Sequence, residues 1–214
     1  MPKKRELNPF KKVLLLISNR KVGRFCLAFF LFFLAFNGFT AILVLYFKEI
    51  FKWGPELSTT AFLIVGIVAT IVQGGLIGPL VKRYGEKKLT LIGLLLVITG
   101  CIIIPLTQPE KAQLYIFTAV GILAFGTGLV TPSLRSLVSK RFDSEGQGVA
   151  LGSLQALQSL GSFIGPPLAG ICYDLLGPTS PFLGASIIVI LVITLIRENP
   201  KRGLSEHETV SRKI

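Results

Sequence analysis

Six long apolar stretches, separated by short polar segments, run through most of the 214 residues. None carries a charged residue in its central third, and none shows the regular polar face of a soluble amphipathic helix. A helix crosses the hydrocarbon core of a bilayer, about 30 Å thick, with roughly 20 apolar residues. The pattern therefore predicts an all-α membrane protein with six transmembrane helices, at Cys26–Phe47, Leu57–Val81, Leu89–Leu106, Leu114–Val138, Val149–Leu176 and Phe182–Ile196.

The distribution of charge predicts how these helices are oriented. If Arg135, near the end of the fourth stretch, is counted with the connection that follows it, twenty of the 23 Lys and Arg residues lie before the first stretch, in every second connection, or after the last stretch, and Lys48, Lys52 and Lys111 lie on the other side. Cytoplasmic loops are rich in Lys and Arg, so we expect a multi-pass protein of the cell or inner membrane with both termini cytoplasmic. The expected domains are a basic cytoplasmic segment (1–24), a six-helix transmembrane domain (25–197) and a polar cytoplasmic tail (198–214).

Composition adds to this picture. Hydrophobic residues make up 51% of the chain and charged residues 16%, and the mean hydropathy is +0.68. The net charge of +12 would suit a nucleic-acid partner, but the charges sit in loops and tails, so we expect no nucleic acid.

Several kinds of site have no sequence support. His207, the one histidine, lies in the polar tail, and Cys26, Cys101 and Cys172 are far apart inside apolar stretches. No zinc spacing, disulfide framework, P-loop or nucleophile–base pair is present. The first apolar run follows 24 residues of basic segment and is too long for a cleavable signal peptide. We therefore expect no metal, no cofactor and no enzymatic activity.

The six stretches differ in polarity. Leu89–Leu106 and Phe182–Ile196 hold no side-chain amide, whereas the other four carry polar and helix-breaking residues near mid-span. Polar groups in hydrocarbon need partners or water. These four stretches should therefore be inner helices, and the two without side-chain amides should be peripheral. The stretch without side-chain amides is the third of each half, which predicts a three-plus-three inverted repeat, typical of secondary transporters. Ile77-Gly78-Pro79 and Ile164-Gly165-Pro166 form a short, weak internal match.

A stripe of small and polar residues follows the fifth stretch at helical spacing: Gly148, Gly152, Gln155, Ser159, Ser162 and Pro166. It predicts either a cavity wall or a helix-packing face. Asn37 beside aromatic residues of the first stretch suits an apolar pocket, although phenylalanine also faces lipid. The candidates for a substrate cavity are Asn37, Phe33, Phe30, Gln73, Thr127, Gln155, Ser159 and Ser162. The candidates for helix packing and gating are Gly78, Gly85, Pro132, Gly152, Gly161, Gly165 and Pro166.

Three segments resemble the major facilitator superfamily. GPLVKRYGEKKL (Gly78–Leu89) is similar to its loop motif G-x-L-x-D-R-x-G-R-K-x-x-L. EGQGVALGSLQALQSLGSFIGPPLAGICYD (Glu145–Asp174) resembles the eleventh helix of its drug:proton antiporters, including the tetracycline-efflux type, and GILAFGTGLVTPSLRSLVS (Gly121–Ser139) resembles their tenth. The resemblance implies the C-terminal six-helix half of a twelve-helix transporter, with 1–24 as part of the linker between halves.

The chain departs from the family pattern at the loop motif, whose candidate residues are Lys82, Arg83, Glu86 and Lys87. Lys82 stands where the family has the aspartate that latches the cytoplasmic gate, and it cannot do that job. Lys82 and Arg83 are nonetheless placed to pair with Asp143 and Glu145 of the next cytoplasmic loop, or simply to be solvated. The six stretches hold no mid-membrane Asp or Glu, the usual proton carrier.

The resemblance implies transport of a small amphipathic or drug-like solute, with this chain as one half. Its partners would be the bilayer, the solute, and a second six-helix half or a copy of itself. The alternatives are a non-transporting membrane subunit and a non-functional fragment of a split transporter gene. A membrane enzyme fits less well.

Overall fold

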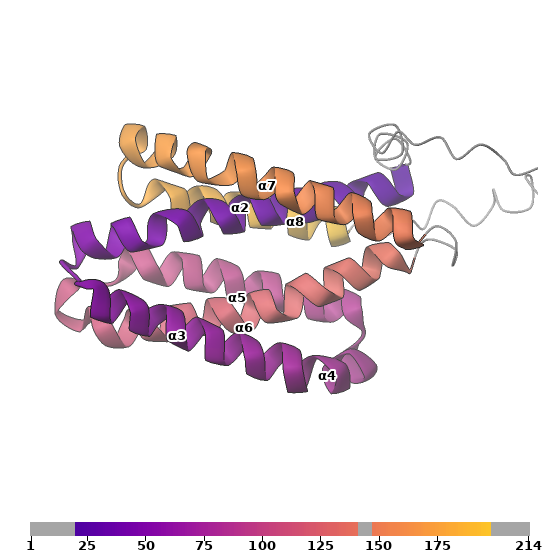
Figure 1. Cartoon of the computed structure of the whole chain (residues 1–214), viewed down its shortest axis with the longest axis horizontal. Helices are drawn as coiled ribbons and strands as arrows, with labels where there is room; N and C mark the ends of the chain where they lie inside the picture. Colours follow the sequence, from indigo (N-terminus) through magenta and orange to yellow (C-terminus); the bar gives the residue numbers. More distant parts are fainter. Residues whose placement is uncertain (1–19, 141–146, 198–214) are drawn as a thin grey trace, which may run out of the picture.

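A computed structural model of the chain describes residues 20–140 and 147–197. Within these ranges all regular structure is helical and no strand is present. Long helices run back and forth along one axis, and the start of α2 lies at the same end of the bundle as the end of α8 (Figure 1). The elements are α2 (Arg20–Ile50), α3 (Pro55–Ile71), the π-helical segment η1 (Val72–Leu76), α4 (Ile77–Tyr84), α5 (Glu86–Leu106), the short turn η2 (Pro109–Lys111), α6 (Ala112–Ser139), α7 (Gln147–Leu176) and α8 (Ser180–Arg197).

Local sequence sets several of the helix ends. Pro55 occupies the first turn of α3, where its missing N–H costs nothing. Gly85 separates α4 from α5 and has φ +76°, a conformation that glycine adopts without steric penalty. Gly177, between α7 and α8, has φ +94° for the same reason. The turns at both ends of the bundle therefore follow from glycine and proline.

The helices pack in two groups of three. One group holds α2, α7 and α8 and the other holds α6, α3 and α5, as the two layers of Figure 1 show. In each group the first helix packs on the other two, and contacts of α5 with α8 and of α2 with α6 join the groups. Fully buried aromatic side chains fill much of the core on the α2 side, among them Phe29, Phe32, Phe47 and Phe182.

Close contact between α5 and α6 depends on glycine. A Cβ at Gly93 would lie 2.6 Å from the Gly126 carbonyl oxygen, and one at Gly126 would lie 2.7 Å from that of Gly93. Small residues let backbones approach in this way in membrane helix pairs. A side chain on either glycine would force the helices apart.

Five of the described helical rods are long and apolar enough to cross a membrane: Gly23–Ile50, Pro55–Tyr84, Glu86–Leu106, Pro109–Ser139 and Ser180–Arg197. They match five of the six stretches expected from the sequence. The remaining stretch corresponds to α7, which is 30 residues long and is not among the five. The protein is thus an integral multi-pass membrane protein, with the sixth span still a prediction.

Burial differs from the inner and peripheral ranking expected from polarity. In the span Pro55–Tyr84, which comprises α3, η1 and α4, only 11% of the residues in the most apolar window are buried, against 50% in the spans that contain α2 and α6. In α5, expected to be peripheral, 44% of that window is buried, because it packs on both α6 and α8. Polarity predicted a neighbour for α3, but on most of its surface the described part of the chain supplies none.

Candidate functional site

The small and polar stripe of α7 lies on the surface. Gln155, Ser159 and Ser162 are exposed, Pro166 is half-buried, and Gly148 and Gly152 are exposed with no atom within 4 Å of a Cβ built on either. Six residues at spacings of three and four share one side of a helix. The stripe therefore forms a continuous, shallow polar strip with no neighbour from the described chain at its glycines.

The opposite side of α7 packs tightly on α2. A Cβ at Gly165 would lie 2.4 Å from the Leu34 carbonyl oxygen, and one at Gly161 would lie 2.9 Å from the Leu34 backbone nitrogen. On α2, Gly38 faces Gly165 at 3.1 Å by the same measure. The backbones of α2 and α7 thus touch along Gly161 and Gly165, which the sequence marked as a packing pair.

The helix α3 and its π-helical continuation carry a second exposed strip. Thr70 and Gln73 are exposed, as are Gly66 and Gly74, and a Cβ at either glycine would meet nothing within 4 Å. The Thr70 hydroxyl donates to the Gly66 carbonyl oxygen at 2.8 Å. Gln73 lies in η1, and π-helical segments occur frequently at functional sites. Like α7, α3 exposes small and polar groups at membrane depth.

The cavity candidates on α2 are more buried in the helix bundle. Asn37 is half-buried and its amide nitrogen donates to the Phe33 carbonyl oxygen at 2.7 Å. Phe33 is buried, while Phe30 lines an apolar crevice with Leu157 and other residues of α2 and α7. The Asn37 amide is thus partly satisfied within its own helix.

Thr127 of α6 lies in a narrow crevice between α2, α3 and α6. Its hydroxyl donates to the Ala124 carbonyl oxygen at 3.2 Å, and Thr40 across the crevice donates to Phe36 at 2.6 Å. The other lining residues are apolar and include Phe62. Within the described ranges, no one pocket gathers the eight cavity candidates: some line crevices between helices and four lie on the exposed strips of α3 and α7.

The gating candidates are divided in the same way. Gly78 is exposed in α4 with open space around it, and Gly85 forms the positive-φ turn. Pro132 lies inside α6, which continues as a helix through it to Ser139. Gly78 is therefore on the surface, Gly85 is a half-buried turn residue, and Pro132 leaves α6 continuous.

The loop motif makes one defined contact. The carboxylate of Glu86 forms an ion pair with Lys140 at the end of α6 and accepts a hydrogen bond from the Ser136 hydroxyl at 3.2 Å. Lys82 and Arg83 are exposed and Lys87 is half-buried. Asp143 and Glu145, expected as partners of Lys82 and Arg83, lie outside the described residues. The motif thus joins the start of α5 to the end of α6 through Glu86.

Sequence reasoning missed one polar contact between α6 and α7. Arg135 lies within α6, not in the following loop, and its guanidinium Nη2 donates to Gln158 Oε1 at 2.8 Å. The Nε atom of Arg135 and the Ser133 hydroxyl oxygen are buried without a hydrogen-bond partner among the described residues. The available signal is an arginine inside the fourth apolar stretch, at a position that the charge count assigns to the following loop.

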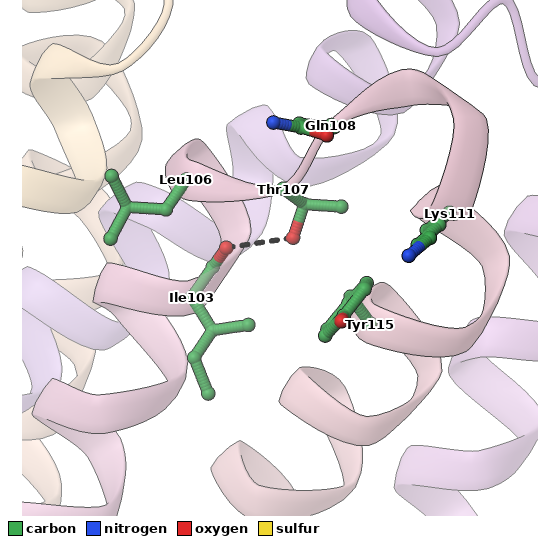
Figure 2. Close-up of a pocket in the computed structure, with 6 residues that line it drawn as sticks. All are labelled: Ile103, Leu106, Thr107, Gln108, Lys111 and Tyr115. Carbon is green, nitrogen blue, oxygen red and sulfur yellow. Dashed lines mark hydrogen bonds between the residues drawn. The ribbon is translucent and has the colours of Figure 1, made fainter.

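The sequence also gave no sign of a pocket where α5 passes into α6. It measures about 370 Å³ and is lined by Ile103, Leu106, Thr107, Gln108, Lys111 and Tyr115. Figure 2 shows the α5 residues on one side and Lys111 and Tyr115 on the other. The described residues hold no group of three His, Cys, Asp or Glu side chains that could bind a metal.

Comparison with known proteins relates this chain to a protein family. The sequence profile of the Major Facilitator Superfamily matches residues 25–212. The tetracycline resistance protein, class C, of Escherichia coli is 27% identical over 169 residues, which are 77% of this chain and 42% of that protein. Hippocampus abundant transcript 1 protein of Mus musculus is 29% identical over 73% of this chain and 32% of its own length. Multidrug resistance protein 2 of Bacillus subtilis is 28% identical over 74% of this chain and 38% of its own.

The chain thus spans about a third to two-fifths of the length of these relatives. The profile covers most of the chain, including every described helix from α3 to α8 and nearly all of α2. It confirms the resemblance seen in the loop motif and in α6 and α7. The chain belongs to the major facilitator superfamily.

Proposed function

We propose that this chain is one six-helix half of a secondary transporter and moves a small amphipathic or drug-like solute only when a second half covers α3 and α7. The observation that supports this most is the exposed strip of α7, with Gln155, Ser159 and Ser162 facing outward. Polar groups exposed to hydrocarbon are unfavourable. A second bundle across the strips of α3 and α7 would enclose these groups in a shared, wetted cavity.

The proposal includes α7 as a sixth span. Its 30 residues correspond to about 45 Å of helix, more than the hydrocarbon core requires. The polar strip lowers its hydropathy, which is the expected property of a helix that lines a cavity. Six spans agree with the charge bias, which predicts that both termini are cytoplasmic.

A three-plus-three repeat is supported by the packing. In such a repeat α2, α3 and α5 of the first half are equivalent to α6, α7 and α8 of the second. The packed pair α2–α7 then has α6–α3 as its equivalent, and the pair α2–α8 has α6–α5. All four of these pairs are in contact. The mid-span dipeptides match as well: Asn37-Gly38 in α2 corresponds to Thr127-Gly128 in α6. Gly38 approaches Gly165 of α7, and Gly128 approaches Val72 of η1. Inverted repeats place the solute site between their equivalent helices.

The names of the relatives and the side chains that are candidates for the cavity wall support this class of solute. Two relatives carry the names tetracycline resistance and multidrug resistance, and this chain offers phenylalanine, amide and hydroxyl groups without a buried acid among the described mid-helix residues. Such a lining suits an amphipathic molecule. The second half is either a separate chain or a copy of this one.

Reconstitution into liposomes tests the need for a second half. Vesicles holding a single fluorescently labelled chain, identified by one photobleaching step, should not accumulate or expel an amphipathic dye under a proton gradient. Vesicles with a second half should do so. Gradient-driven flux in single-chain vesicles would overturn the proposal, and absence of flux with every partner would favour a non-transporting subunit.

Labelling of intact cells tests the topology. A cysteine replacing Gly54, in the connection between α2 and α3, should react with a membrane-impermeant maleimide, and one replacing the exposed Lys88 should not. The reverse pattern would invert the orientation.

A further inference from the structure

The pocket between the ends of α5 and α6 is separate from the strips of α3 and α7. Ile103 and Leu106 belong to the last turn of α5, Thr107 and Gln108 to the connection, and Lys111 and Tyr115 to η2 and α6. Its volume, about 370 Å³, is within the range of small-molecule sites, roughly 300–1,000 Å³. Figure 1 shows that α5 passes into α6 at the end of the bundle opposite to the end of α8, and the pocket's lining residues lie at this connection.

One side of the pocket offers hydrogen-bond donors and a positive charge. Figure 2 shows the Lys111 ammonium turned toward the space between the two helices, with Tyr115 below it and the Gln108 amide above. No carboxylate lines the pocket, and among the described residues Lys111 has no ion-pair partner. The Thr107 hydroxyl already donates to the Ile103 carbonyl oxygen at 2.8 Å. Lys111, Tyr115 and Gln108 therefore remain to bind an anion.

The α5 side of the pocket is apolar, and exposed leucines lie beside the pocket on both helices. Leu106 is 75% exposed, and Leu114, one helical turn after Lys111, is 70% exposed. Exposed leucines at the end of a membrane-spanning helix mark the edge of the hydrocarbon region, where lysine and tyrosine are also found. The pocket thus joins a cationic polar part to an apolar wall at the boundary where lipid headgroups lie.

We propose that this pocket binds the phosphodiester headgroup of an anionic phospholipid. The Lys111 ammonium contacts the phosphate, Tyr115 and Gln108 donate hydrogen bonds to the headgroup, and Ile103 and Leu106 contact the first carbons of the acyl chains. Because the site lies on α5 and α6, away from the α3 and α7 strips, it does not depend on a second half.

Native mass spectrometry of the purified full chain tests this proposal. The chain in detergent is titrated with phosphatidylglycerol or with phosphatidylcholine of the same acyl chains, and bound lipids are counted. A lysine ammonium about 4 Å from an anionic phosphate should favour phosphatidylglycerol by about fivefold. Lys111→Gln should remove that preference, Lys111→Arg should keep it, and Lys48→Gln, which changes an exposed lysine at the same end of the bundle, should also keep it.

Three results would overturn the assignment. The first is equal binding of the two lipids by the unchanged chain. The second is an equal loss of the preference for phosphatidylglycerol in Lys111→Gln and Lys48→Gln. The third is full displacement of phosphatidylglycerol by millimolar inorganic phosphate, which would indicate a free-anion site instead. Size-exclusion elution and Trp53 fluorescence confirm that each variant is folded, so that a loss of preference reports on the pocket.

Discussion

The two sides of α7 use the same residue types for different purposes. On one side, Gly161 and Gly165 are pressed against the backbone of α2, with less room than a methyl group needs. On the other side, Gly148 and Gly152 have no atom within 4 Å of a built Cβ, and the serines and Gln155 beside them are exposed. The first side is covered by α2, whereas the second is polar and has no neighbour at its glycines among the described residues.

This difference shows what a small residue means in a membrane helix. A glycine in contact with a neighbouring backbone is required for folding of the chain itself. A glycine with open space around it, in a strip of hydroxyl and amide groups, leaves room that none of the described residues fills. The following experiments separate the two roles.

The largest effect is expected at the packed side. Gly165→Ala places a methyl group 2.4 Å from the Leu34 carbonyl oxygen, and backbone cannot move aside easily, so the free energy of unfolding should fall by about 1–3 kcal/mol or more. Gly152→Ala is the matched control, which should be neutral or stabilise by up to about 1 kcal/mol because alanine favours helix. Unfolding in SDS–dodecyl maltoside micelles can be followed by Trp53, the single tryptophan. Equal losses in the two variants would refute the distinction.

A smaller loss is expected between α6 and α7. Gln158→Leu removes the acceptor of the 2.8 Å hydrogen bond from Arg135 and leaves a partly buried charged donor unpaired, which should cost roughly 1–3 kcal/mol of unfolding free energy. Gln155→Leu, less than one helical turn away on the exposed strip, should change the same quantity by under about 0.5 kcal/mol. A larger loss for Gln155→Leu would mean that the strip already has a partner within the chain.

The smallest effect is expected at the loop motif. The Lys140 side chain is 67% exposed and that of Glu86 is 16% exposed, and such surface ion pairs contribute about 0–1 kcal/mol. Glu86→Gln should therefore lower the unfolding free energy by less than about 1 kcal/mol, and the difference should shrink in high salt. A loss above 2 kcal/mol that does not depend on salt would show that this contact controls the packing of α5 on α6.

The sequence predicted the helices well because the requirement for an unbroken apolar run is local. The expected starts and ends of the stretches fall within a few residues of α5, α6, α7 and α8. Family membership was visible in the same way, through contiguous motifs in α6, α7 and the loop before α5.

The arrangement of the candidate site was less accessible from sequence. Spacing places Gly152 and Gly165 on α7 but does not say which of them meets another helix. The π-helical segment at Val72–Leu76 has no residue pattern of its own. The pocket beside Lys111 depends on how the chain turns between α5 and α6, a feature of tertiary structure that no periodicity encodes.

Cysteine crosslinking tests the central claim, that the strips of α3 and α7 meet a second half, most directly. With the three native cysteines replaced by alanine, single cysteines are introduced at exposed positions Thr70 of α3 and Ser159 of α7, and as controls at Leu95 of α5 and Ile187 of α8. In native membranes, Thr70→Cys and Ser159→Cys should give crosslinked products with a second chain or a second copy, and Leu95→Cys and Ile187→Cys should not. Crosslinks through Leu95→Cys and Ile187→Cys, with none through α3 and α7, would contradict the account.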